Sequence, residues 1–321
     1  MEYRKLIKFG KNSFVISLPK SWIEKNHLKK SDLLYLAVES DQLVITPEPK
    51  TGMNEERELS VDVDRVVPGS LRRRLKSSYI DNYHVITFFG KTIPQQADHI
   101  REEVNDLMAL EIVEQTPTKI VAKNYLNMNE ISLSETLRKV DNILRYEFVI
   151  LKNILTKKIE GTKEDVIKEA YRMDGDINRL MFLLLRTVKF LSNTAEISRG
   201  KNVINNEDLL RIWMLISVLE KIGDELKRLI KKLISAKQLV KEKDLLFIVD
   251  QIEDAFKQAM KSFYLKDVEL AFKVSEDNKV RLKKLILDFL EKNTSNVFVA
   301  SMRENFVNLY YNIVEIPRLQ Y

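Results

Sequence analysis

The first chemistry that the sequence offers is contact with a polyanion, and the residues for it gather at the N-terminal end. Residues 1–31 hold eight Lys and Arg against two acidic residues, whereas the net charge of the whole 321-residue chain is only +6. Basic side chains on paired strands can neutralise nucleic-acid phosphates, and a β layer can enter a groove. Charge alone leaves open a solvated basic surface without a ligand. The candidate DNA-binding residues are Arg4, Lys5, Lys8, Lys11 and Lys20.

The second candidate chemistry is cation binding by oxygen-bearing side chains in the C-terminal half. Glu220 and Asp224 are four residues apart, as are Asp174 and Asn178, so each pair shares one face of a helix. If the two helices pack antiparallel, these oxygens could converge on a hard or borderline cation. Acidic pairs at this spacing are also common on solvated helices, and that alternative stays open. Gly223 is expected to allow close helix packing, because Gly costs about 1 kcal/mol against Ala in a helix.

Residues 1–49 are expected to form the β domain that positions the basic side chains. Strands are predicted at 3–9, 14–18, 33–38 and 42–46, and a short helix at 20–26 begins after Pro19. A segment this small cannot easily close a hydrophobic core alone. We therefore expect it to dimerise with a second copy of the chain.

Between residues 50 and 128 the pattern changes twice. The polar run at 50–60 is expected to be a linker. Residues 61–128 are expected to form a small α/β domain, because helix patterns there alternate with short apolar runs typical of strands. The predicted elements are helices at 68–79 and 94–107, a strand at 83–89, and a hairpin of 112–115 with 119–122.

From residue 129 to residue 321 we expect an all-helical domain. Ser132 and Glu135 have the spacing of a capping box, and apolar residues then recur at three- and four-residue intervals. Long helices with short connections favour an antiparallel bundle, here two sets of three. The predicted fold class is therefore multidomain α+β. The predicted helix breaks lie near residues 160–162, 198–200, 235–241, 266–267 and 293–295.

The N-terminal residues carry a family resemblance. The stretch 4–20, RKLIKFGKNSFVISLPK, followed by a short helix at 22–28 and by Lys30-Ser31-Asp32, resembles the SpoVT/AbrB swapped-hairpin fold. The shared pattern is a basic strand, a Gly turn, a strand that ends in Pro-Lys, a short helix and a turn before Asp. Ser31 stands where the family usually has Gly, so the turn is expected to be either strained or of a different type. The resemblance implies an interlocked homodimer that binds DNA through its hairpins; dimerisation alone is the rival interpretation.

Two segments of the helical half resemble the PhoU family. Residues 217–226, SVLEKIGDEL, are similar to its LERIGD signature with Lys221 in place of Arg, and residues 173–180, MDGDINRL, are similar to its acidic segment. Weaker counterparts lie at 275–280 and 304–315. The resemblance implies a surface cluster of iron, zinc or similar divalent ions. The candidate ligands are Asp174, Asn178, Glu220, Asp224, Asp277 and Glu304.

Other functional classes find no support in the sequence. There is no Cys, phosphate-binding glycine loop, nucleophile elbow or HExxH motif, so we do not expect an enzyme. The absence of a signal peptide and of a long apolar run favours a cytoplasmic protein. The resemblances imply a dimeric DNA-binding transcriptional regulator of phosphate uptake, a fusion associated with archaea. The alternative is an adaptor that docks on a phosphate transporter or signalling protein, with a hairpin domain that only dimerises.

Overall fold

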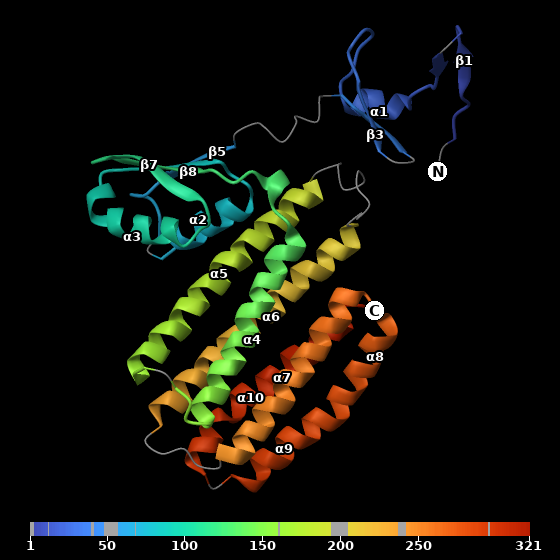
Figure 1. Ribbon diagram of the computed structural model, residues 1–321. Helices are drawn as coiled ribbons and strands as arrows, with labels where there is room; N and C mark the ends of the chain where they lie inside the picture. The colour runs from blue at the N-terminus through green and yellow to red at the C-terminus, as the bar shows by residue number, and fades with distance from the viewer. Residues whose placement is uncertain are drawn as a thin grey trace. The chain divides into compact units, whose positions relative to one another are not determined.

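The computed structural model divides into two compact units (Figure 1). Among the described residues, the first comprises residues 3–47 and the second comprises residues 57–321. The residues that the structure describes are 3–11, 13–39, 42–47, 57–67, 69–159, 161–193, 205–236, 242–294 and 296–321.

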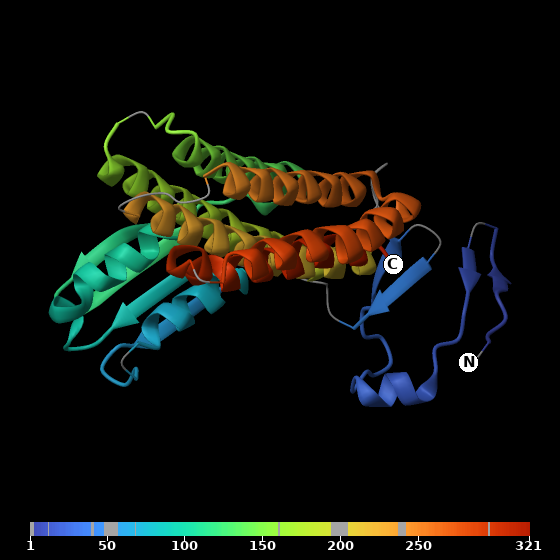
Figure 2. The same cartoon turned by 90° about the horizontal axis from the view of Figure 1, so that it is seen from below.

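The N-terminal unit consists of two separate hairpins joined through a short helix (Figure 2). In the first hairpin, β1 (Ile7–Phe9) pairs antiparallel with β2 (Ser13–Val15). The helix α1 (Lys20–Lys25) follows, and in the second hairpin β3 (Tyr35–Glu39) pairs antiparallel with β4 (Gln42–Thr46). These elements confirm the predicted order of strands and helix. Over residues 3–36 and 43–47, no side chain whose exposure the structure describes is buried.

The turn before β3 contains the predicted departure from the usual glycine. Ser31 has a φ of +77°, in the left-handed region where a side chain costs about 1 kcal/mol. The turn is closed on either side of it, because the backbone N–H of Lys29 donates to the Asp32 carboxylate at 2.6 Å. The sequence expectation of a strained turn therefore agrees with the backbone geometry.

The second unit begins with a small α/β region. Its four strands lie in the order β5-β6-β8-β7, with β5 parallel to β6 and the other pairs antiparallel. Two helices cover one face, where they share an apolar core with the sheet (Figure 1). The elements are β5 (Glu58–Asp62), α2 (Leu71–Ile80), β6 (Val85–Phe89), α3 (Ile93–Asn105), β7 (Leu110–Thr116) and β8 (Lys119–Asn124).

Strand β5 corrects the predicted linker at 50–60, which contains its first half. The strand alternates: Leu59 is half-buried and Val61 is buried in the core, while Glu58 and Ser60 are exposed. Leu59, Val61 and the following Val63 alternate with polar residues, which is the pattern of a half-buried strand, and pairing with β6 completes it.

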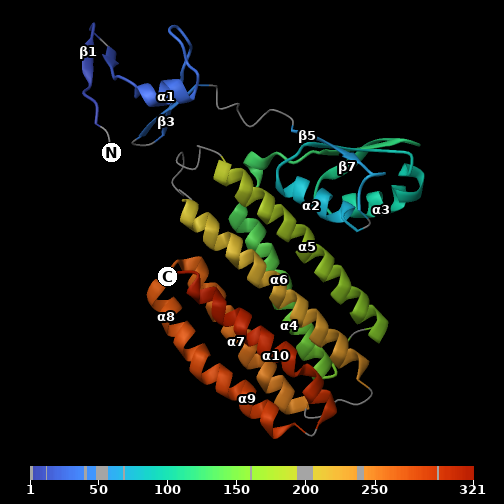
Figure 3. The same ribbon diagram turned by 180° about the vertical axis from the view of Figure 1, so that it is seen from behind.

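The helical region follows the predicted two sets of three helices (Figure 3). Ser132 caps the first helix, because its Oγ accepts from the Glu135 backbone N–H at 3.3 Å. The predicted break at 198–200 lies outside the described residues, and the fifth helix is interrupted by a π-helical turn, η3. The elements are η1 (Met128–Glu130), α4 (Leu133–Leu155), α5 (Lys163–Asn193), α6 (Asn206–Ser235), α7 (Glu242–Leu265), α8 (Val268–Asp277), η3 (Asn278–Leu282), α9 (Lys283–Lys292) and α10 (Val297–Arg318).

Within the bundle, α6 packs against α4, α5 and α10, and α4 also packs against α7, so the two sets share one core. None of the described helices has both the length and the apolar run needed to cross a bilayer.

A buried arginine joins the bundle to the α/β region. The Arg186 side chain leaves α5 with 0% exposure, and its guanidinium donates to the carbonyl oxygens of Tyr79 at 2.5 Å and Tyr83 at 3.4 Å. It also lies 4.7 Å from the centre of the Tyr79 ring. Burial lowers the pKa of Arg186 to about 10, so the group stays charged at neutral pH. A buried charge needs such acceptors, and this one fixes α5 against the end of α2.

We predict that Arg186→Ala lowers the free energy of unfolding by roughly 2–4 kcal/mol, because it leaves a cavity and removes charge-assisted hydrogen bonds. The matched control is Arg172→Ala on the same helix, where the side chain is exposed and pairs with Glu169; it should cost about 0.5 kcal/mol or less. Urea unfolding of both variants measures the difference. Equal losses would contradict the assigned role of Arg186.

Candidate functional site

The β1–β2 hairpin carries part of the predicted DNA-binding set. Lys8 lies in β1 opposite Phe14, and Lys11 follows Gly10 in the turn; both lysines are exposed. Arg4 and Lys5 precede β1 and are also exposed. The hairpin and the residues leading into it therefore hold four of the five predicted residues.

The fifth residue, Lys20, lies in a different element. It is the first residue of α1, and its ammonium is 3.6 Å from the Glu24 carboxylate on the same helix. Both side chains are largely exposed, so this pair is weak and leaves Lys20 available to another anion.

The two faces of the hairpin differ in character. Because side chains alternate along a strand, Ile7 and Phe9 lie on the face opposite Lys8, together with Val15, the pairing partner of Ile7. Phe9 is 69% exposed and Ile7 is 59% exposed. Contiguous exposed apolar side chains on so small a unit are typical of an interface. The hairpin thus offers an apolar face of Ile7, Phe9 and Val15, and a mixed face on which Lys8 lies beside its pairing partner Phe14, which is 62% exposed.

In the bundle, the predicted carboxylates converge on a lysine. The Lys227 ammonium, on α6, is 2.6 Å from Oδ1 of Asp174 on α5 and 3.0 Å from Oδ1 of Asp224 on α6. Arg228 also donates to Asp224 at 3.1 Å. Burial opposes the charge of Lys227, but its hydrogen bonds to Asp174 and Asp224 prevail and raise its pKa. The position between the two helices is held by a permanent cation.

A third carboxylate, which the sequence prediction missed, lies beside this pair. Glu147 on α4 is fully buried, and neither of its oxygens has a hydrogen-bond partner in the part of the chain that the structure describes. Burial raises the pKa of Glu147 well above its usual value; the negative charges of Asp174 and Asp224 raise it further, whereas Lys227 opposes them. Its signal in the sequence is a charged residue within the apolar stripe of α4.

Gly223 makes the close approach of these helices possible. A Cβ at this position would lie 3.2 Å from the end atoms of both Ile177 on α5 and Leu144 on α4, and 3.8 Å from Oε2 of Glu147. The expected role of Gly223 in close packing is confirmed, and it brings α6 against the helices that carry the other carboxylates.

The remaining candidate ligands are placed differently. Asn178 donates to Asp174 at 3.4 Å. Glu220 is exposed, but partial burial of its carboxyl and the nearby charge of Asp224 raise its pKa. Asp277 is bound by Arg281 on its own helical stretch at 3.0 Å, and Glu304 is exposed on α10. The second half of the predicted set therefore does not form a counterpart to the first.

The side chains present do not fit the implied metal cluster. Hard cations require several oxygen ligands, but the two carboxylates that meet, Asp174 and Asp224, already share the Lys227 ammonium. Across the described ranges, no group of three or more His, Asp or Glu is arranged to hold a metal ion. The ammonium of Lys227 supplies, as part of the chain itself, the positive charge that a metal ion would bring to this position.

Comparisons with known proteins bear on both halves of the chain. Residues 7–52 match the family described as "Antidote-toxin recognition MazE, bacterial antitoxin". Among solved structures, the crystal structure of PhoU from Pseudomonas aeruginosa matches with 14% identity and a TM-score of 0.39, over 59% of this chain and 93% of that chain. A search of the curated proteins found no match. The chain thus joins a MazE/AbrB-like N-terminal segment to a helical region with a PhoU structure among its structural neighbours.

The buried carboxyl of Glu147 predicts a pH dependence of stability. A raised pKa in the folded state means that stability is greatest below the unfolded pKa and is lost as pH rises through the folded one. Glu147→Gln should remove this loss and raise the free energy of unfolding at about pH 8 by on the order of 1 kcal/mol. Urea unfolding at about pH 5 and about pH 8 tests it.

Glu253 on α7 is the matched control for this prediction. It is also buried, but Lys152 and Lys257 bind its carboxylate at 2.5 and 2.6 Å. Burial opposes its ionisation, yet these hydrogen bonds lower its pKa. Its stabilising contribution is therefore present above the unfolded pKa, and Glu253→Gln should lower stability at about pH 8. If both variants shifted stability in the same direction, the assigned environments would be wrong.

We also predict that Lys227→Met increases affinity for divalent cations. The substitution removes the ammonium between Asp174 and Asp224, so Mn²⁺ binding by equilibrium dialysis should tighten by roughly tenfold or more relative to the unaltered chain. Elemental analysis of purified Glu220→Ala and Asp224→Ala provides the comparison. Stoichiometric iron or zinc in the unaltered chain that is lost in Asp224→Ala would contradict the role given to Lys227.

Proposed function

We propose that this chain is a dimeric DNA-binding transcriptional regulator of phosphate uptake. The observation that carries the proposal is the β1–β2 hairpin, which exposes Ile7 and Phe9 on one face and Lys8 beside Phe14 on the other. A second copy of the chain would cover the apolar face, since the unit has no buried side chain of its own among those described. The basic residues would then lie on an outer surface shared by two hairpins.

Contact with DNA phosphates is the chemistry this surface suits best. Lysine side chains neutralise phosphates and release condensed counterions, and this contact gives affinity without sequence preference. The excess of basic over acidic residues in the first 31 residues supports such a surface. Similarity of residues 7–52 to the MazE family supports a small hairpin domain that works in association with another molecule.

The link to phosphate uptake depends on the PhoU-like signature in α6. Within it, Gly223 and Asp224 form the packed junction with α5 and α4, so the residues that carry the resemblance also organise the bundle. In this proposal the bundle senses a partner protein or a small ligand and alters how the two hairpins are presented. The protein acts inside the cell and without catalysis.

An adaptor is the second candidate. The exposed apolar face of the hairpin accounts for dimerisation by itself, and Lys20 already has Glu24 as a neighbour. In that case the bundle docks on a phosphate transporter or signalling protein, and the hairpins do not contact DNA.

A salt titration of duplex binding separates the two candidates. The full chain should bind duplex DNA at low salt, with log K falling by about 0.9 per phosphate contacted as log salt rises. Lys8→Ala and Lys11→Ala should each weaken binding to every sequence and reduce this slope by about 1. Lys284→Ala, at an exposed position on α9, is the control and should change nothing.

The mass of the protein in solution is measured alongside DNA binding, so that loss of the dimer can be told from loss of the DNA contact. Phe9→Asp should abolish both the dimer and DNA binding, because it places a charge in the apolar face. An intact dimer that binds no duplex at low salt would overturn the proposal and favour the adaptor.

A further inference from the structure

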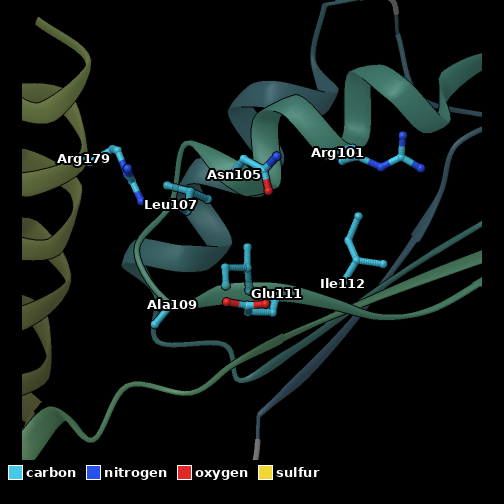
Figure 4. A pocket seen from close by; sticks show the side chains of 8 residues that line it. Arg101, Asn105, Leu107, Ala109, Glu111, Ile112 and Arg179 are labelled. Atoms are coloured by element: carbon cyan, nitrogen blue, oxygen red, sulfur yellow. The ribbon is translucent and has the colours of Figure 1, made fainter. Parts of the chain in front are cut away.

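A cavity of about 300 Å³ lies where the α/β region meets helix α5 (Figure 4). The end of α3, the start of β7 and one turn of α5 form its walls, and Leu107, Leu110 and Ile112 make its apolar part. Its polar lining consists of Arg101, Asn105, Glu111 and Arg179. The accessible lining of the cavity is mainly polar, which suits a small charged ligand better than an apolar one.

Arg179 is the basic residue of this lining whose charge has no partner among the described residues. Its guanidinium has no hydrogen-bond acceptor or ion-pair partner among the described residues, and its Nε is buried. Figure 4 shows the side chain reaching from α5 toward the space between the end of α3 and the start of β7. An arginine held at a partly buried position without an acceptor loses hydration and gains nothing in return, unless an anion occupies the cavity.

The other residues of the same helix stripe are all engaged. Phe182, Arg186 and Lys189 follow Arg179 at intervals of three or four residues, so all four face the α/β region. Arg179 therefore differs from its neighbours in having only the cavity before it. Phe182 lies against the ammonium of Lys76, Arg186 donates to the Tyr79 carbonyl, and Lys189 forms an ion pair with the Asp81 carboxylate.

The charges around the cavity leave Arg179 uncompensated. Arg101 donates to Asp98 at 2.9 Å and to Gln115 at 3.1 Å, so its charge is largely satisfied on the outer side. Glu111 is the one acid in the lining, and its strand position is paired with Lys123 of β8. The Asn105 amide adds a donor that has no partner among the described residues.

We propose that this cavity binds a small oxyanion, such as a phosphate or a phosphoryl group, through the guanidinium of Arg179 with help from the Asn105 amide. A planar guanidinium binds two oxyanion oxygens side by side, which gives both affinity and orientation. The bound anion connects α5 to the α3–β7 junction. This site is independent of DNA binding by the hairpin, and either proposal can fail without the other.

Direct binding of inorganic phosphate to the full chain tests the site. Isothermal titration at constant ionic strength should show saturable binding of one phosphate per chain, with sulfate as a competitor. Arg179→Gln should weaken it by more than about tenfold, whereas Glu111→Gln should tighten it, because one like-charged group is removed. Arg172→Gln is the control: it lies on the same helix, away from the cavity, and should bind as the unaltered chain does.

A parallel titration with AMP distinguishes a free anion from the phosphoryl group of a larger molecule. Tighter binding of AMP than of phosphate, lost in Arg179→Gln, supports the site and assigns it to a phosphorylated ligand. If Arg179→Gln does not fold, Arg179→Lys replaces it as the test variant, because it keeps the positive charge. This variant should bind phosphate more weakly than the unaltered chain, since lysine lacks the planar guanidinium. No saturable binding of either probe, or equal binding by the Arg179 and Arg172 variants, would overturn the proposal.

Discussion

The guanidinium of Arg186 is buried between helix α5 and the end of α2, and a buried charge is stable only where acceptors surround it. This requirement fixes the rotation of α5 about its own axis. Once α5 is fixed, Asp174 faces α6 on one side of the helix while Arg179 faces the α/β region on another. The carboxylate junction and the oxyanion cavity therefore both depend on where one arginine is held.

The N-terminal unit differs from the rest of the chain because its described side chains form no buried core. It has few residues for a core and leaves Ile7 and Phe9 exposed, and in the proposed function another molecule covers them. A second copy of the same hairpin satisfies this need without any other partner. Dimerisation also doubles the local number of basic side chains, which matters because phosphate contacts add up in affinity.

Local signals in the sequence predicted most of the fold. Ser132 marks the start of α4 by its capping spacing, and the apolar repeats predicted the helices that follow. Strand β5 was missed although Leu59, Val61 and Val63 alternate with polar residues, because the polar residues before and between them resemble those of the predicted linker. The strain at Ser31 was among the expectations because Ser stands where the family pattern has Gly, and the φ of Ser31 is indeed positive.

The sites were predicted less well than the fold, since they depend on contacts between distant residues. Asp174 and Asp224 were correctly expected to come together, but the lysine between them comes from the same helix as Asp224 and changes what the pair can bind. Glu147 lies outside the motifs that drew attention to the bundle, and Arg179 lies within the segment 173–180, where only its acidic neighbours were considered. The packing of α4 against α5 and α6 shows that Glu147 is buried without a partner among the described residues, and the packing of α5 against the α/β region shows that Arg179 faces a cavity.

In the proposed function, two copies of the hairpin unit act together on duplex DNA. Hydroxyl-radical footprinting, on a duplex that the full chain selects from a random pool, measures this joint action. We expect two protected segments related by a dyad, one for each hairpin unit. A single protected segment without symmetry, or no protection at a concentration where the chain is a dimer, would contradict it.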